Sequence, residues 1–275
     1  MNAFSGRHAV VTGGSSGIGL ALALLLAGRG AHLSLVARDR SKLDAAGDQV
    51  GAARANQDQR VHLYSADVSD RVQVETAFSD ILRDQGPADL LVTSAGMAHP
   101  GHFMALPLEV FERTMAVNYF GTLYAIRAAL PSMLERKTGC LVLISSGAGL
   151  IGTYGYTSYS PSKFALRGLA ESLRGELKRS GIGVSIVYPP DTDTPQLREE
   201  NRTKPEATKR ITGTARIRSP EMVARKILQG IEKGSFSITP GWEMTLLFRL
   251  QSILVPIAHR YFDYLIRKSD AEAKR

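Results

Sequence analysis

The chain has 275 residues, 44% of them hydrophobic, which is long enough to bury the core of one α/β domain. Its formal net charge is +8, but the basic residues are scattered until the last third, which argues against a nucleic-acid-binding module and leaves open an anionic membrane or cofactor. A single cysteine, Cys140, excludes an internal disulfide framework, and no apolar signal segment precedes the first predicted strand, so we expect a cytoplasmic protein.

Short apolar runs alternate with helical periodicity from residue 8 to residue 188. This alternation indicates parallel pairing through right-handed crossovers and predicts an α/β fold with a doubly wound parallel sheet of the Rossmann type. Ligands of such a sheet bind at the carboxyl ends of its strands. The predicted strands are 8–12, 33–37, 61–66, 90–93, 141–145 and 184–188, and the predicted helices are 20–28, 41–55, 71–85, 108–136 with a bend or break at Pro131, and one bearing Tyr159 and Lys163.

One folded domain is predicted over 1–240, because no internal repeat or low-complexity tract stands out. Within it, 189–220 mixes proline, threonine and charged residues with little periodicity, which is typical of a long lid loop over a site. The remaining segment, 241–275, is predicted to be an amphipathic extension.

A glycine-rich turn joins the first predicted strand to the first helix. The run Thr12-Gly13-Gly14-Ser15-Ser16-Gly17-Ile18-Gly19 has glycines at 13, 17 and 19. These let the backbone turn tightly and approach a pyrophosphate, whose charge is favoured by amide groups at the following helix start. A mere tight turn is the alternative, but the placement between strand and helix favours a dinucleotide site.

Tyr159 and Lys163 are four residues apart, so on a helix both side chains point to one face. Reduction of a ketone requires a proton donor within hydrogen-bond reach of the carbonyl oxygen, and Tyr159 is the candidate general acid. We expect the cation of Lys163, together with oxidised nicotinamide, to lower the pKa of this phenol. Ser146 stands upstream after an apolar strand, and Ser145 is its rival by position.

The order of these elements, a glycine turn, a serine-bearing strand and then Tyr-x-x-x-Lys, resembles the short-chain dehydrogenase/reductase family. By that resemblance Lys163 also binds the nicotinamide ribose, and Ser146 hydrogen-bonds the substrate oxygen. Asn118, in the matching run 116–119, is implied to hold a water in a proton relay. A helix-interior amide with local hydrogen bonds is the alternative for Asn118.

The residue after the second strand bears on the cofactor. Arg38 stands where an NAD-selective site typically has an acidic side chain, and its guanidinium suits the 2′-phosphate of NADP(H). Asp39 is the rival, since it lies about twenty residues past the glycine turn. The family resemblance favours NADP(H) and adds as cofactor contacts Asp67 and Val68 at the adenine, Ala95 and Gly96, and Pro189, Thr192 and Thr194, of which Thr194 matches the threonine that meets the carboxamide.

The sequence departs from the family pattern at two places. Thr93 and Ser94 replace two asparagines, so the usual sheet-stabilising amide contacts are in doubt, whereas the close backbone approach at Gly96 is retained. Pro190 replaces a glycine after Pro189, which is expected to stiffen the hinge of the lid.

The lid carries the more distinctive resemblance. Its runs 188–195, YPPDTDTP, and 199–205, EENRTKP, resemble 3-ketodihydrosphingosine reductases. This implies NADPH-dependent reduction of the 3-keto group of a long-chain sphingoid base to dihydrosphingosine. The enzymatic alternative is a related reductase of a steroid, retinoid or acyl ketone. The non-enzymatic alternative is an NADP-binding sensor or scaffold, against which the complete set of predicted catalytic residues argues.

The end of the chain predicts a helix with one apolar face, interrupted too often for a transmembrane span of about twenty apolar residues. An interfacial helix at the cytosolic face of a membrane, with Arg260, Arg267 and Lys268 at anionic headgroups, is favoured. A helix docked on the domain or on a second subunit is the alternative. The apolar residues recur every four positions, at Leu246, Leu250 and Leu254 and at Ile253, Ile257, Tyr261 and Leu265.

The resemblance further implies a homodimer or homotetramer, paired through the two long helices that precede and bear the catalytic residues. No metal site is predicted, because the pair His99 and His102 lacks further ligands at suitable spacing. We expect these histidines to be solvated or to line the substrate pocket. The nearby phenols Tyr154 and Tyr156 are also expected to line the pocket.

Overall fold

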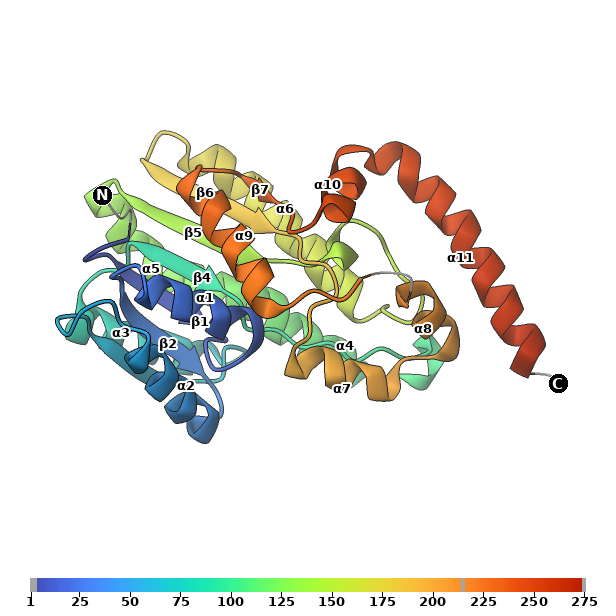
Figure 1. Ribbon diagram of the computed structural model, residues 1–275, viewed down its shortest axis with the longest axis horizontal. Coiled ribbons are helices and arrows are strands. Elements are labelled where there is room, and N and C mark those ends of the chain that lie inside the picture. The colour runs from blue at the N-terminus through green and yellow to red at the C-terminus, as the bar shows by residue number, and fades with distance from the viewer. Residues whose placement is uncertain (1–3, 214–215, 274–275) are drawn as a thin grey trace.

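The computed structural model describes residues 4–213 and 216–273, and it contains one sheet with the strands β1 His8–Thr12, β2 His32–Ala37, β3 Val61–Ser65, β4 Leu90–Thr93, β5 Gly139–Ile144, β6 Ile182–Val187 and β7 Ser237–Ile238. All pairings are parallel, in the order β3-β2-β1-β4-β5-β6-β7 (Figure 1). The chain therefore adds β2 and β3 on one side of β1 and the later strands on the other side, so the strand order reverses between β1 and β4. This is the topological switch point at which doubly wound sheets bind ligands.

Helices cover both faces of the sheet (Figure 1), which confirms the predicted fold class. Successive residues of a strand point to opposite faces of the sheet and pack in different hydrophobic cores. Val11 packs with the helices of one face and Val10 with those of the other, as expected for a sheet buried on both sides. One face is covered by α1 Gly17–Ala27, α2 Arg40–Ala52 and α9 Pro220–Glu232, and the other by α3 Arg71–Gln85, α5 Gly121–Arg136 and α6 Tyr159–Leu177. The remaining helices are α4 Leu108–Met115, α7 Pro195–Thr203, α8 Glu206–Thr212, α10 Trp242–Arg249 and α11 Gln251–Ala273.

The helix predicted over 108–136 is found as α4, a π-helical turn and α5 in succession. The π-helical turn, Ala116–Phe120, contains Asn118, and such turns are frequent at functional sites. A break at Pro131 is not found, because α5 continues through this residue to Arg136. Pro131 and Arg127 are both exposed, so water can satisfy the carbonyl of Arg127, which loses its helical donor.

The prediction of a loop over 189–220 was wrong, because α7 and α8 lie within it. The helix α7 begins after Thr194, whose hydroxyl accepts a hydrogen bond from the Leu197 amide at 3.2 Å, and Pro195 is its first residue. Threonine at the cap and proline at the first position are helix-start signals. The helix has almost no apolar residues, so it shows no periodicity that would predict it. The helix α9 and the strand β7 were also not predicted.

The predicted C-terminal helix is two helices, α10 and α11, which meet at Leu250. The helix α11 continues through Pro256 and packs beside α8 (Figure 1). Among the residues the structure describes, no helix is both long and apolar enough to cross a bilayer. Cys140 lies in β5 and is partly buried.

Candidate active site

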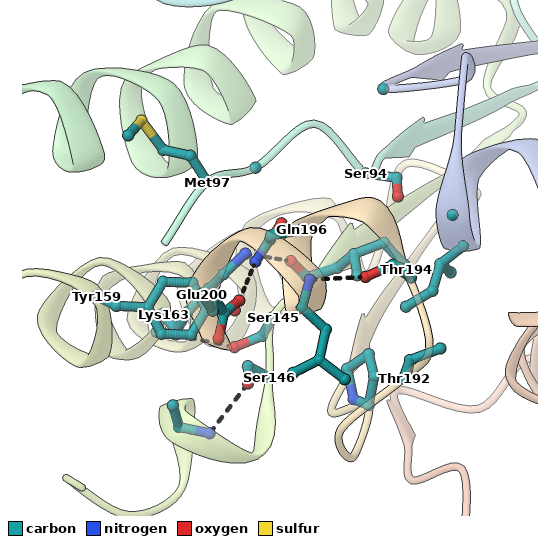
Figure 2. Close-up of a pocket in the computed structure, with 18 of the residues that line it drawn as sticks. Ser94, Met97, Ser145, Ser146, Tyr159, Lys163, Thr192, Thr194, Gln196 and Glu200 are labelled. Atoms are coloured by element: carbon teal, nitrogen blue, oxygen red, sulfur yellow. Dashed lines mark hydrogen bonds between the residues drawn. The ribbon is translucent and has the colours of Figure 1, made fainter. Parts of the chain in front are cut away.

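A cavity of about 540 Å³ lies beyond the carboxyl ends of β1 to β6, at the switch point of the sheet. Nearly all of the predicted site residues line it. Gly19 and Asn118 do not reach the cavity wall, and both lie directly behind residues that do. Figure 2 shows Tyr159 and Lys163 of α6 gathered with Gln196 and Glu200 of α7.

The glycine turn after β1 packs closely on itself and on the loop after β4. Gly13 has φ 69° and Gly17 has φ 55°, a left-handed conformation that L side chains rarely adopt. A Cβ at Gly13 would lie 2.5 Å from the Ala95 amide nitrogen, and one at Gly19 would lie 2.3 Å from the Gly13 carbonyl oxygen. The side chain of Ser16 makes no capping hydrogen bond at the start of α1. The first amides of α1 are therefore available to an anionic group.

Arg38 and Asp39, the two candidates after β2 for selecting the cofactor, make different contacts. The carboxylate of Asp39 caps α2 by accepting a hydrogen bond from the Lys42 amide at 3.1 Å, and that bond lowers the pKa of Asp39. Asp39 also forms an ion pair with the Lys42 ammonium at 3.3 Å. Arg38 is exposed at the mouth of the cavity, with its guanidinium 3.8 Å from Asp67. Arg38 is therefore the residue whose charge is presented to a ligand.

Asp67 is held in place by its neighbours. It accepts hydrogen bonds from the Ser69 amide at 3.0 Å and hydroxyl at 2.7 Å, and it pairs with Arg113 at 2.5 Å. Burial alone would raise the pKa of Asp67, but these bonds outweigh it and hold the pKa below its usual value. The adjacent Val68 packs against Gly121, where a Cβ would lie 2.8 Å from a Val68 methyl group. The loop after β3 is thus fixed against α5.

Tyr159 and Lys163 lie on one face of the first turn of α6, as predicted. Both side chains are buried, and the Lys163 ammonium lies 5.5 Å from the centre of the Tyr159 ring. It donates a hydrogen bond to the Ile144 carbonyl at 3.1 Å. Burial lowers the pKa of Lys163 to about 8. These contacts fix the lysine between the end of β5 and the phenol.

The protein groups around Tyr159 raise its pKa, and the lowering by Lys163 together with oxidised nicotinamide stays a prediction. Burial raises it most, the carboxylate of Glu200 raises it further, and hydrogen bonds with Ser146 and Gln196 only partly offset this. The sequence indicates the lysine four residues away but not the buried carboxylate on the lid. The phenol is therefore protonated at neutral pH, and in these surroundings it is a weaker acid than free tyrosine.

The two serines after β5 are distinguished by their contacts. Ser145 is buried and donates its hydroxyl hydrogen to the Lys163 carbonyl at 3.0 Å, so it fixes α6 to the sheet. The hydroxyl of Ser146 faces the cavity, where it interacts with Tyr159 and accepts a hydrogen bond from the Ala148 amide at 3.1 Å. Both serines line the cavity, but the Ser145 hydroxyl is bonded to the backbone of α6, whereas the Ser146 hydroxyl lies beside the Tyr159 phenol.

Asn118 is fully buried, and its side chain makes three local hydrogen bonds. It accepts from the Met97 amide at 2.9 Å and donates to the Met97 carbonyl at 3.0 Å and the Ser162 hydroxyl at 2.9 Å. These bonds connect the loop after β4 to α6, in agreement with the alternative interpretation. The role of Asn118 in a proton relay stays a prediction.

The remaining predicted pocket residues divide in two. Tyr156 lines the cavity and donates a hydrogen bond to Glu200 at 2.8 Å. Tyr154 and His102 lie outside the cavity wall and contact each other at 3.2 Å. No cluster of three metal-ligating side chains occurs within 4–213 and 216–273.

Several pocket residues were not predicted. Asp191, Gln196 and Glu200 come from the lid, and Glu200 is buried beside Tyr159 and Lys163 (Figure 2). No periodicity or motif in the sequence distinguishes Glu200 from its exposed neighbour Glu199. The C-terminal helices also reach the cavity and form an apolar wall with residues of the lid and of the loop after β5, namely Met244, Leu247 and Phe262 together with Ile151 and Ile211.

Comparisons with known proteins agree with this geometry. The family model described as short chain dehydrogenase matches residues 7–205. The chain is 43% identical over 256 residues to the 3-ketodihydrosphingosine reductase of Bos taurus, across 93% of this chain and 77% of the relative. It is 44% identical over 254 residues to the 3-dehydrosphinganine reductase of Danio rerio, across 92% of this chain and 76% of the relative.

Solved structures give the same picture. A short-chain dehydrogenase from Sphingobium yanoikuyae in complex with NADPH has a TM-score of 0.78 and 26% sequence identity, covering 90% of this chain and 92% of that one. A short-chain dehydrogenase/reductase from Burkholderia phymatum in complex with NAD has a TM-score of 0.80 and 26% identity, covering 91% and 94%.

Proposed function

The chain belongs to the short-chain dehydrogenase family, and on that premise we propose that it is an NADPH-dependent 3-ketodihydrosphingosine reductase. It reduces the 3-keto group of this long-chain sphingoid base to the alcohol of dihydrosphingosine. The observation that carries the proposal is the identity of 43% and 44% to two vertebrate enzymes of this activity, which extends over the lid and the start of the C-terminal helices. The pocket supports it with a buried proton donor below an apolar wall.

The cofactor is NADP(H), which when bound supplies the hydride for the carbonyl carbon. The residues present fit this group. The glycine turn packs so closely on itself and on the loop after β4 that Gly13 and Gly19 have no room for a Cβ, and the start of α1 offers amides without a side-chain cap to the pyrophosphate. We assign the 2′-phosphate to Arg38, since Asp39 is engaged as a helix cap. We assign the adenine to Asp67 and Val68, and the nicotinamide side to Gly96, Lys163, Pro189, Thr192 and Thr194.

The proton for the new alcohol comes from Tyr159 in this proposal. Its buried phenol holds the proton at neutral pH and donates it to the ketone oxygen as the alcohol forms. The hydroxyl of Ser146, which already interacts with that phenol, orients the same oxygen. The ammonium of Lys163 lies near enough to stabilise the phenolate left behind.

The apolar wall accounts for a long-chain substrate. Met244, Leu247 and Phe262 of the C-terminal helices and Ile211 of α8 line the cavity on the side of the lid. An alkyl chain placed there is removed from water, which stabilises binding by about 0.8 kcal/mol per buried methylene. We therefore propose that 241–275 completes the substrate site of the domain 1–240.

The test follows NADPH absorbance with purified protein and detergent-dispersed 3-ketodihydrosphingosine. A steroid ketone and a short 3-ketoacyl thioester are assayed beside it. Preferential turnover of the sphingoid ketone is the expected result. Preference for another ketone would retain the reductase assignment and contradict the substrate.

We further propose that α10 and α11 contact the cytosolic face of a membrane. Trp242, Ile253 and Ile257 are exposed apolar residues on these helices, and the basic residues Arg260 and Arg267 lie on α11. The test is flotation with phosphatidylserine vesicles. Replacing Ile253 and Ile257 by glutamate should abolish binding, whereas glutamate at the exposed Val72 of α3 should not.

A homodimer or homotetramer that pairs through α5 and α6 is proposed on the family resemblance. Exposed aromatic side chains at both helices, Phe120 just before α5 and Phe164 on α6, support it. Light scattering after size exclusion measures the oligomeric state. Glutamate at Phe164 should shift the protein toward the monomer.

A further inference from the structure

Glu200 is a carboxylate placed where the chemistry of ketone reduction does not require one. It lies on the lid helix α7, its residue is only 7% exposed, and it lines the same cavity as Tyr159. Burial is the main cause of the pKa shifts of both Tyr159 and Lys163, and the charge of Glu200 acts on both groups as well, which places it beside the two residues that handle the proton. Carboxylates are rarely buried unless they are paired.

Two hydrogen bonds fix the orientation of this carboxylate (Figure 2). One oxygen accepts from the Tyr156 hydroxyl at 2.8 Å and the other accepts from the Gln196 amide at 2.9 Å. Gln196 also interacts with Tyr159, so an unbroken chain of polar groups connects the carboxylate to the proton donor. An ionised carboxylate has about four acceptor positions, so two remain for a ligand.

Within the part of the chain that the structure describes, no cation lies at ion-pair distance from Glu200. Among the residues the structure describes, Glu200 forms no ion pair, and neither does the neighbouring acid Asp191. Lys204 and Lys163 act on Glu200 only at longer range, and the ammonium of Lys163 is already bonded to the Ile144 carbonyl. Burial raises the pKa of Glu200, as expected for a carboxylate without a close counter-ion. A cationic ligand group would relieve this cost.

We propose that Glu200 binds the substrate's ammonium group, which is attached to the carbon next to the ketone. This inference rests on the proposed function. When Tyr159 and Ser146 hold the ketone oxygen, the neighbouring nitrogen must lie close to them. Asp191 also lines this cavity, but Glu200 is the lid carboxylate that Gln196 connects to Tyr159. Glu200 is thus a specificity-determining residue, which distinguishes an amino ketone from a neutral ketone of the same chain length.

The same contacts admit a purely structural role, in which the bond between Tyr156 and Glu200 holds α7 against the domain. The two roles predict different results. A structural latch affects all substrates alike, whereas an ammonium site affects only substrates that carry the charge.

The experiment compares the wild-type enzyme with Glu200→Gln, an isosteric change that keeps an acceptor for Tyr156. The substrates are 3-ketodihydrosphingosine and 1-hydroxyoctadecan-3-one, which lacks only the amine. Glu199→Gln is the matched control, because Glu199 is the neighbouring acid on α7 and is 64% exposed. The affinity for NADPH, measured by fluorescence, and the melting temperature report on folding.

Wild-type enzyme should prefer the amino ketone. Glu200→Gln should lower kcat/KM for the amino ketone by roughly 10- to 100-fold, the value of a charge-assisted hydrogen bond. It should change kcat/KM for the neutral ketone by less than about threefold and leave NADPH affinity unchanged, while Glu199→Gln alters neither substrate.

An equal loss for both ketones, or no loss for either, would overturn the ammonium site and leave the reductase in place. A wild-type enzyme that reduces a steroid ketone or an acyl thioester but neither long-chain ketone would overturn the proposed function, and this inference with it. The two failures are therefore distinguishable.

Discussion

On its cofactor side the cavity is bounded by backbone, whereas on its substrate side it is bounded by side chains. The turn after β1 fits a ligand through glycine conformations and free amides. The lid and the C-terminal helices contribute a carboxylate, an amide and apolar groups from α7, α10 and α11. Close approach of the backbone restricts the residue types allowed and leaves a pattern in the sequence. A side-chain wall can be built from many sequences, so the lid runs 188–195 and 199–205 indicate a family by resemblance but do not show which of their side chains line the site.

The largest effect is expected where the two sides meet, at Tyr159. Replacing Tyr159 by phenylalanine removes the proton donor and should lower kcat by about 10²- to 10⁴-fold, the usual contribution of general acid catalysis. Affinity for NADPH should be retained, because the ring still fills its place. Stopped-flow absorbance and NADPH fluorescence measure the two quantities. Tyr154→Phe is the control, since that phenol contacts only His102. Substantial turnover by the Tyr159 variant would contradict the mechanism.

The cofactor side can be tested at the end of β2. Arg38→Ala should weaken NADPH binding by roughly 10-fold or more and leave the weaker NADH binding unchanged, because only NADPH has the 2′-phosphate. Asp39→Ala should leave the ratio of the two affinities unchanged and destabilise the fold by about 1 kcal/mol through loss of the α2 cap. Calorimetric titration with each nucleotide measures the ratio. A changed ratio in the Asp39 variant would reassign the selectivity.

A smaller effect is expected at Gly17. Alanine there must adopt φ 55°, which costs about 1–2 kcal/mol, and its Cβ would lie 3.0 Å from a Thr194 methyl group. We expect NADPH affinity to fall by roughly 10-fold. Alanine at Gly28 is the control, because that residue has helical φ and its Cβ would lie 3.6 Å from the nearest atom. Equal affinities in the two variants would show that the turn does not depend on its glycine.

The distinction between a site bounded by backbone and one bounded by side chains explains which features the sequence could predict. The bounds of β1, α3 and β4 coincide with the prediction, because apolar periodicity and caps mark them. The helix α7 was missed, because its outward face is almost wholly polar and burial of Leu197 and Glu200 alone gives no periodicity. The raised pKa of Tyr159 was not predicted, because it comes first from burial of the phenol and then from the carboxylate of Glu200, and a glutamate is by default expected in solvent. Only the folded lid places Glu200 beside the phenol.

The smallest expected effect is on the stability of the fold, which the carboxylate of Glu200 should lower as the pH rises. The pKa of Glu200 is raised in the folded state, so as pH rises above the ordinary glutamate value the unfolded state loses its proton first and stability falls. This cost is absent below the ordinary pKa and complete above the raised one. Glu200→Gln should therefore melt at the same temperature as wild type near pH 4 and a few degrees higher near pH 8, at about 2–4 °C per kcal/mol.

The control for this measurement is Glu199→Gln, which should show no pH-dependent difference because Glu199 is exposed. Scanning calorimetry without substrate, at both pH values, gives the comparison. A variant at Glu200 that is less stable than wild type at pH 8 would indicate that the carboxylate stabilises the lid. A variant that is more stable yet poorer with the amino ketone would show that the substrate side retains a destabilising charge for recognition.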